Sequence, residues 1–189
     1  MLLGGVGRNS EAHCAALPCS RSQRRNTADA YCAPTTVAMT PDLVHVCDID
    51  VEVGPIRDLG PTPHGRRRII AVLGGRVTGP RLEAEIVPGG ADWQYVRGDG
   101  VVELEARYSI RTRDGAEIAV TNRGLRRAPP DVMERMNRGE AVDPALVYFR
   151  TVPTFEAPAG PHDWLNRSVF VATAARLPDR VQIRVFEML

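Results

Sequence analysis

The feature that most constrains this chain is the strict alternation of apolar and polar residues between Val102 and Ile110. Every second residue, starting at Val102, is apolar, whereas the residues between them include Glu103, Glu105 and Arg107. A period of two is typical of a β-strand that packs one face and leaves the other polar. This stretch therefore predicts a strand, and it raises the question of whether the charged face meets water or lines a site.

Similar segments recur from Met39 onward between glycine and proline turn signals. We expect strand breaks at Gly54-Pro55, at Pro88-Gly89-Gly90 and at Pro153, and a bulge or a close backbone approach at Gly74-Gly75. A short helix is predicted between Pro129 and Gly139, because paired prolines precede a weak apolar stripe. About eight to ten short antiparallel strands with one helix predict an all-β sandwich or barrel. The other expected strands are Leu43 to Val53, Arg68 to Val77, Arg81 to Val87, Ala116 to Asn122, Leu146 to Glu156, Ser168 to Arg176 and Arg180 to Met188.

Composition excludes several function classes. The net charge is +1, so we expect neither a nucleic-acid partner nor an anionic membrane partner. All 24 basic residues are arginines, which removes Schiff-base chemistry, covalent pyridoxal phosphate and a P-loop lysine. No apolar run approaches the ~20 residues that span a bilayer.

The first 38 residues differ from the rest in composition and show no sustained periodicity. We expect residues 1–38 to be a disordered extension, with translation starting at Met39 in one interpretation, and residues 39–189 to form a single domain. The four cysteines end at Cys47 and form no CxxC pair. They would not span the folded region as a disulfide framework, so a reduced, cytoplasmic setting is expected.

A set of motifs in order resembles a known family. Together they are similar to the domain of unknown function 3237, also called uncharacterised protein family 0311, over Leu43 to Leu189. The resemblance implies a small antiparallel, up-and-down β-barrel, lipocalin-like in outline, and no established general activity. The motifs are GGRVTGP (Gly74 to Pro80), PGGADW (Pro88 to Trp93), EARY (Glu105 to Tyr108), RDGAEIAVTNRG (Arg113 to Gly124), YFRTVPTFE (Tyr148 to Glu156) and WLNRSVFV (Trp164 to Val171).

Two positions depart from the family's pattern. Glu105 stands where the family has aspartate, which keeps the carboxylate but lengthens its side chain. His162 stands where the family has tyrosine before the Trp-Leu-Asn step. If the position of His162 touches a ligand, we expect ligand choice or pH dependence to differ in this protein.

Glu105 and Arg107 are two apart and so share one face of a strand. They either hold a polar ligand between them or form an ion pair on a solvated surface, worth about 0 to 1 kcal/mol. Asp92 and Trp93 follow a glycine pair, where they either meet a ligand at a barrel mouth or cap a turn and plug the barrel. Asn122 either binds the ligand or satisfies the backbone of a turn.

The remaining candidates form aromatic and polar clusters late in the chain. Each has the alternative interpretation that it belongs to the core or to a solvated surface. As ligand-binding candidates we name Trp93, Tyr108, Asn122, Arg150, Phe155, Glu156, His162, Trp164 and Asn166. No histidine pair has HxH or HxxxH spacing, so no metal is expected, and no cofactor motif is present.

Three hypotheses follow. In the first, the barrel binds a small polar, anionic or carbonyl metabolite. In the second, it is a cofactor-free isomerase, cyclase or lyase, with Glu105 or Asp92 as the acid or base and Arg107 stabilising negative charge. In the third, the barrel is packed throughout and serves a structural or interaction role. A homodimer is compatible with each.

Overall fold

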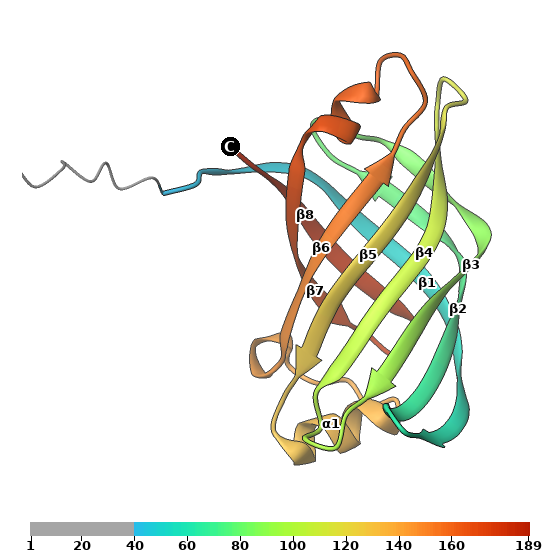
Figure 1. Cartoon of the computed structure of the whole chain (residues 1–189), viewed down its shortest axis with the longest axis vertical. Coiled ribbons are helices and arrows are strands. Elements are labelled where there is room, and N and C mark those ends of the chain that lie inside the picture. The colour runs from blue at the N-terminus through green and yellow to red at the C-terminus, as the bar shows by residue number, and fades with distance from the viewer. Residues whose placement is uncertain (1–39) are drawn as a thin grey trace, which may run out of the picture. The chain divides into compact units, whose positions relative to one another are not determined.

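In the computed structural model, which describes residues 40–189, eight strands form a closed antiparallel barrel (Figure 1). Each strand pairs with its neighbour in sequence, and β8 pairs with β1, so the predicted up-and-down barrel is confirmed. The expected extension, residues 1–38, lies outside the described residues. The strands are β1 (Leu43–Thr62), β2 (Gly65–Thr78), β3 (Ala84–Val96), β4 (Val102–Thr112), β5 (Glu117–Arg127), β6 (Tyr148–Glu156), β7 (Val169–Arg176) and β8 (Arg180–Met188).

Two of the expected strand breaks are bulges instead. β1 continues past Gly54-Pro55, and its pairing with β2 shifts register between Val53 and Ile56. β3 runs through Pro88-Gly89-Gly90, with its register against β4 shifting between Val87 and Ala91. Gly89 has a φ of 115°, a conformation that favours glycine. The strands of a closed barrel have to bend, and β-bulges provide this bend. Because bulges also contain glycine and proline, they are easily mistaken for turns in the sequence.

β6 likewise continues through Pro153, where a break was expected. A central strand donates backbone N–H groups to the strands on both of its sides, and proline has no N–H group to donate. Here Pro153 pairs with Asn122 of β5, and β6 pairs with β7 at only two positions. The predicted break at Pro153 is therefore wrong, because β6 continues through this residue. The pairing of β6 with β7, however, does not extend to Pro153.

The helix is confirmed as α1 (Pro130–Asn137), with proline in its first turn and Asp131 near its N-terminus. It crosses the lower end of the barrel in Figure 1. Its residues Val132 and Met133 are buried. Val132 packs in a small apolar cluster that also contains Leu104 and Phe149 from the barrel wall, so this end of the barrel is closed.

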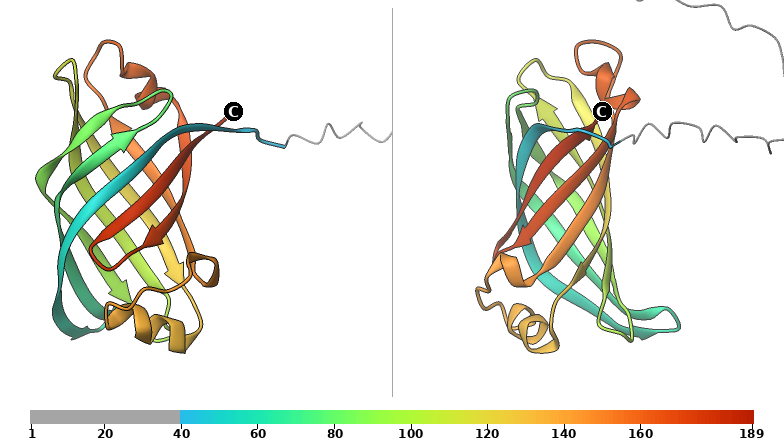
Figure 2. Two further views of the ribbon diagram at one scale, coloured as in Figure 1. Left: turned by 180° about the vertical axis from the view of Figure 1, so that it is seen from behind. Right: turned by 90° about the vertical axis from the view of Figure 1, so that its left-hand side faces the viewer.

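The opposite end is covered by the segment between β6 and β7, which contains the short helix η2 (Asp163–Arg167) (Figure 2). Leu165 is buried in the main apolar cluster. The ring of Trp164 meets that of Phe170 edge-on, with centroids 5.9 Å apart. A second short helix, η1 (Pro144–Leu146), precedes β6.

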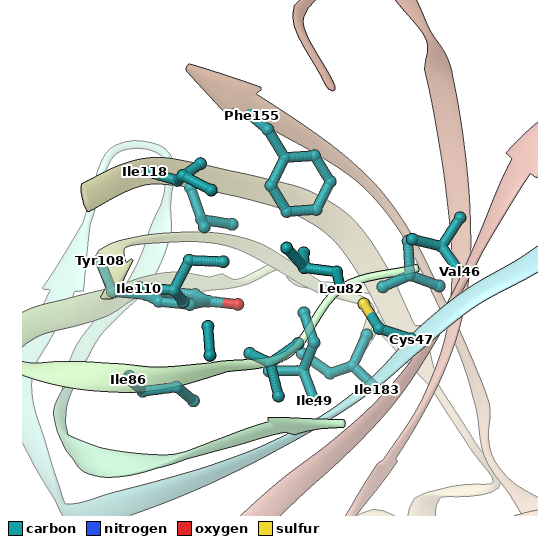
Figure 3. Packing of buried hydrophobic residues seen from close by; sticks show 14 of the residues in the cluster. Val46, Cys47, Ile49, Leu82, Ile86, Tyr108, Ile110, Ile118, Phe155 and Ile183 are labelled. Carbon is teal, nitrogen blue, oxygen red and sulfur yellow. The ribbon is translucent and has the colours of Figure 1, made fainter. Parts of the chain in front are cut away.

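The main apolar cluster fills the upper lumen with side chains from most of the strands (Figure 3). It includes Ile49, Ile110, Ile118 and Phe155, which are the residues that alternation places inward. Ala174 and Val181 pack against both this cluster and the lower one. Polar side chains are also buried inside the barrel, and they form the candidate site described next.

Candidate functional site

Glu105 and Arg107 point away from the lumen. Their neighbours Leu104 and Tyr108 face inward and are buried, whereas the Arg107 side chain is 63% exposed. Arg107 Nε donates to Glu105 Oε1 at 2.6 Å, and Arg123 Nε donates to Glu105 Oε2 at 2.8 Å. The charged face of β4 is therefore on the outer wall of the barrel.

These two residues share an outer groove of about 920 Å³ with Trp93, Tyr95 and Val152. Hydrogen bonds from Arg123 and Arg107 lower the pKa of Glu105, so it remains a carboxylate. Glu105, Arg107 and Arg123 pair with one another in this groove, and such exposed ion pairs create little demand for a charged ligand. Arg67, which also lines the groove, lies 4.0 Å from the Tyr95 ring centre and has no ion-pair partner among residues 40–189. A ligand contact at Trp93, Glu105 or Arg107 stays a prediction.

Four other sequence-predicted residues face the lumen: Asp92, Tyr108, Asn122 and Phe155. Backbone register brings Asp92 opposite Ala106, Ala106 opposite Asn122, and Asn122 opposite Pro153. Residues paired in this way project to the same side of a sheet. The register thus brings Asp92 and Asn122 to the same level of the lumen wall, separated by the small side chain of Ala106.

Further polar side chains, which the sequence alone did not single out, are buried or partly buried nearby, and the charges of two of them, Arg126 and Arg176, act on Asp92. Gln94 follows Asp92 on the inner face of β3, Arg126 follows Asn122 on β5, and Arg176 lies near the end of β7. Alternation could have found Arg126, since it has the same parity as the buried residues Ile118 and Val120. We call this set the polar layer: Asp92, Gln94, Asn122, Arg126, Thr151 and Arg176.

Arg126 is the least expected member of the polar layer. It is 5% exposed, its guanidinium lies 5.5 Å from the Phe149 ring centre, and its Nε has no hydrogen-bond partner among residues 40–189. Burial lowers the pKa of Arg126 to about 10, and the positive charges of Arg176 and Arg68 act in the same direction. Asp92 is the carboxylate that partly offsets them. This part of the lumen therefore carries an excess of positive charge.

The carboxyl of Asp92 lies inside the wall, although other parts of the residue are partly exposed. Its Oδ2 accepts from Gln94 Nε2 at 2.6 Å, and its Oδ1 is buried without a partner among the described residues. Burial raises the pKa of Asp92, against the opposing effects of the Gln94 hydrogen bond and of Arg126 and Arg176. Asp92 can therefore hold or release a proton closer to neutral pH than an exposed aspartate can.

Three more oxygens of the polar layer are buried and unpartnered within residues 40–189. They are Asn122 Oδ1, Gln94 Oε1 and Thr151 Oγ1, and Asn122 is only 2% exposed. Tyr108 lies in the neighbouring apolar cluster (Figure 3), its OH has no hydrogen-bond partner in the described part of the chain, and burial raises its pKa. Buried polar groups in proteins are nearly always hydrogen-bonded, so this concentration of exceptions makes the polar layer the candidate site.

The candidates at the upper rim have structural partners. Asn166 holds the segment between β6 and β7 by donating to Ala157 O and accepting from Ala157 N, each at 2.9 Å. His162 Nε2 lies 3.2 Å from Asp114 in the β4–β5 turn. The guanidinium of Arg81 lies 4.0 Å from the centre of a Trp164 ring. These residues are separate from the polar layer.

The last two candidates, Arg150 and Glu156, lie on the exposed face of β6. Their alternate neighbours Phe149, Thr151 and Phe155 face inward, as the alternation in this segment predicts. Within residues 40–189, no group of three or more histidine, cysteine or acidic side chains is arranged to hold a metal ion.

Comparison with known proteins places the barrel in a family. A family model described as "Protein of unknown function (DUF3237)" matches residues 41–188. The chain belongs to the DUF3237 family. A UPF0311 protein of Bradyrhizobium diazoefficiens is 43% identical over 153 residues, which are 80% of this chain and all of that protein.

Solved structures show the same barrel. A conserved protein of unknown function from Rhodopseudomonas palustris has a TM-score of 0.78 at 40% identity, over 80% of this chain and 99% of that one. An enzyme from Penicillium herquei has a TM-score of 0.60 at 19% identity, over 80% of this chain and 96% of that one, a likeness that shows the fold alone. Among the motif residues of this DUF3237 barrel, Asp92 and Asn122 face the lumen, whereas Glu105 and Arg107 lie outside.

Proposed function

We propose that this DUF3237 barrel binds a small anionic or carbonyl-bearing metabolite inside its lumen, at the polar layer. The observation that carries the proposal is the Arg126 guanidinium, which is buried among further positive charges with an unpartnered Nε. A buried charge without a partner is costly to the fold by several kcal/mol, and an anionic oxygen would offset that cost. An arginine fork is also well suited to carboxylates and to other oxyanions.

The neighbouring groups favour a ligand with more than one polar atom. Asn122 Oδ1 and Gln94 Oε1 are acceptors, so they fit a hydroxyl or amide donor of the ligand. Thr151 Oγ1 can donate to a carbonyl or accept from a hydroxyl. A packed structural barrel, the third hypothesis, gives no reason for so many unmatched polar atoms in one layer.

Mass spectrometry of the purified protein tests this proposal. We expect the native protein to carry a small molecule that denaturation releases, and Arg126→Met to lose most of it. Arg107→Met, which removes an arginine from the outer wall, should keep the same occupancy. Asn122→Leu, of similar volume, provides a second lumen variant if Arg126→Met does not fold. Equal occupancy in the lumen variants and in Arg107→Met would rule the lumen site out.

A second candidate function is cofactor-free catalysis in the same layer, as an isomerase, cyclase or lyase. Asp92 favours it, because its raised pKa and free Oδ1 suit a group that exchanges a proton with a bound carbonyl compound. In this version Arg126 takes the role of anion stabiliser that was assigned to Arg107. Glu105 is a less suitable acid or base, since its carboxylate is bound by two arginines.

Deuterium exchange separates the two functions. Phenylpyruvate, an anionic keto acid, would be incubated in D2O with the wild-type protein and with Asp92→Asn. Catalysis predicts that the wild type accelerates exchange at the carbon next to the carbonyl, and that Asp92→Asn binds phenylpyruvate but exchanges it at the buffer rate. Acceleration that survives in Asp92→Asn would exclude Asp92 as the base.

A cytoplasmic setting and a homodimer stay predictions. Cys47, the one cysteine among residues 40–189, is buried. Cell fractionation and size-exclusion chromatography with light scattering would test the two expectations.

A further inference from the structure

The polar layer is closed off along the axis of the barrel. At the lower end, Val132 and Met133 of α1 are buried, with Val132 packed close to Leu104 and Phe149. At the upper end, Leu165 of η2 is buried in the main apolar cluster. A ligand that reaches Arg126 has to pass one of these ends or pass between two strands.

The wall is weakest between β6 and β7. These strands pair only at Arg150 with Thr173 and at Thr151 with Ala172, whereas β4 and β5 pair without interruption from Val102 to Arg111. Pro153 contributes to the gap, because it has no N–H to donate. Separating β6 from β7 therefore breaks far fewer backbone hydrogen bonds than separating β4 from β5 would.

An apolar groove of about 550 Å³ lies over this seam. Its lining includes two residues that face the lumen, Thr151 and Ala172, which also form one of the two seam pairs. Thr151 belongs to the polar layer, and its Oγ1 is buried without a partner within the described residues. The groove and the polar layer thus meet at Thr151. The outer part of the groove is lined by the apolar residues Leu43, Leu125, Val152, Val171 and Phe186, and by Tyr148 and Arg150.

We propose that the ligand is amphipathic, with its anionic end at Arg126 in the polar layer and its apolar end passing between β6 and β7 into the groove lined by Leu125, Val152 and Phe186. The inference rests on the proposed lumen site and adds a substrate class to it. Arg126 supplies the charge that recognises the anionic end, and the groove supplies an apolar surface of a size suited to a chain or ring. Thr151 lies where the two meet.

Calorimetry with two simple carboxylates tests the inference, with propionate representing the anionic end alone and decanoate adding an apolar chain. We expect the wild-type protein to bind both, and decanoate to bind more tightly by about fourfold for each methylene group that enters the groove. Val152→Asp should remove most of that gain and leave propionate binding unchanged. Leu73→Asp is the matched control, because Leu73 is an exposed apolar residue on β2 and does not line this groove.

The possible results separate the two proposals. If decanoate binds no more tightly than propionate, or if its advantage survives Val152→Asp, the amphipathic ligand is wrong while the lumen site stands. If Arg126→Met abolishes binding of both acids and Arg107→Met does not, the anionic end is confirmed at the polar layer. If the wild-type protein binds neither acid, the anionic lumen site and the inference built on it both fail.

Discussion

Arg126 costs the fold stability because its charge is buried, and the same charge is what the proposed binding of an anion requires. A buried guanidinium with an unpartnered Nε lowers the stability of the protein, yet the same group can recognise an anion. Methionine has a similar length and no charge, and the site of Arg126 borders an apolar cluster through Phe149. The fold itself therefore gives no reason for a charge at this position, and the proposed function does.

Arg126→Met is predicted to raise the free energy of unfolding of the ligand-free protein by about 1 to 4 kcal/mol, because it removes the cost of the buried charge. Urea denaturation of protein refolded without its small molecule measures this change. Arg107→Met, which removes an arginine from the exposed outer wall, should change stability by no more than about 0.5 kcal/mol. A clear loss of stability in Arg126→Met would mean that the charge has a structural partner.

Asp92 makes stability depend on pH in a direction opposite to that of most carboxyl groups. Burial raises its folded-state pKa, so the folded protein keeps this proton at pH values where the unfolded chain has lost it. The stability that Asp92 contributes is therefore full below its unfolded-state pKa of about 3.9 and is lost as the pH rises through the folded-state pKa.

The stability gained by Asp92→Asn is accordingly predicted to be small near pH 3 and to increase toward pH 7, measured by urea denaturation as a difference from the wild type. Asp99→Asn provides a control of opposite sign. A backbone hydrogen bond from Val101 lowers the pKa of Asp99, so this variant should lose stability as the pH rises. A pH-independent difference for Asp92→Asn would contradict the raised pKa.

At the scale of the element, β5 and β6 approach closely at Gly124. A Cβ added there would lie 2.3 Å from the carbonyl oxygen of Arg150 and 2.8 Å from the Cα of Thr151. Because those atoms belong to the backbone of β6, a larger residue could be accommodated only by moving the strand. Gly124 thus sets the spacing of the two strands beside Asn122 and Thr151 in the polar layer.

Gly124→Ala is predicted to destabilise the protein by about 1 to 3 kcal/mol, since it forces a backbone shift in a packed wall. Gly98→Ala is the matched control, because a Cβ added at Gly98 meets nothing within 4 Å. It should stay within about 0.5 kcal/mol of the wild type in urea or thermal unfolding. Equal effects of the two substitutions would show that the close approach is relieved at little cost.

The segment that covers the upper end depends on Asn166. Its side chain makes two hydrogen bonds to the backbone of Ala157, so Asn166→Ala is predicted to cost about 1 to 3 kcal/mol and to speed proteolysis between β6 and β7. Arg167→Ala, at an exposed neighbour paired with Asp163, should do neither. If Asn166→Ala left stability unchanged but lost a co-purified small molecule, Asn166 would be a ligand contact and not a structural residue.

At the scale of the whole molecule, closure of the barrel is uneven. A closed barrel has no free edge, but the two pairs between β6 and β7 leave adjacent N–H groups without a partner strand. Amide exchange followed by NMR is predicted to be fast at Phe155, because its N–H lies on the same side of β6 as the nitrogen of Pro153 and faces β7 beyond the two pairs. Amides throughout Val102 to Ile110 should be slow. Uniform protection along β6 would contradict an open seam.

Much of the fold could be predicted from local pattern. Alternation correctly assigned Tyr108 and Ile110 to the inside and Phe149 to the face opposite Arg150. Breaks were misplaced at Gly54-Pro55 and Pro88-Gly89-Gly90, because glycine and proline mark bulges as readily as they mark turns. Whether the chain turns or bends at such a point depends on pairing with a neighbouring strand, which the local sequence does not contain.

The candidate site was only partly predictable for the same reason. Asp92 and Asn122 were singled out, and the structure places both in the lumen, whereas Arg126, Gln94 and Thr151 were missed although each has the parity of its buried neighbours. The Glu105 and Arg107 pair attracted attention by its motif but points outward.

The sequence by itself determined which residues share a face of each strand, since the two-residue period is a property of extended backbone. It also determined that the chain forms an antiparallel β-domain without lysine chemistry. Only the tertiary structure decided which face of each strand points into the lumen and which lumen residues become neighbours. Register between separate strands brings Asp92 and Asn122 to either side of Ala106, and barrel closure buries them together with Thr151 and with Arg126, whose charge acts on Asp92. Their chemistry comes from that shared burial, which strengthens electrostatic interactions and leaves polar atoms for a ligand to satisfy.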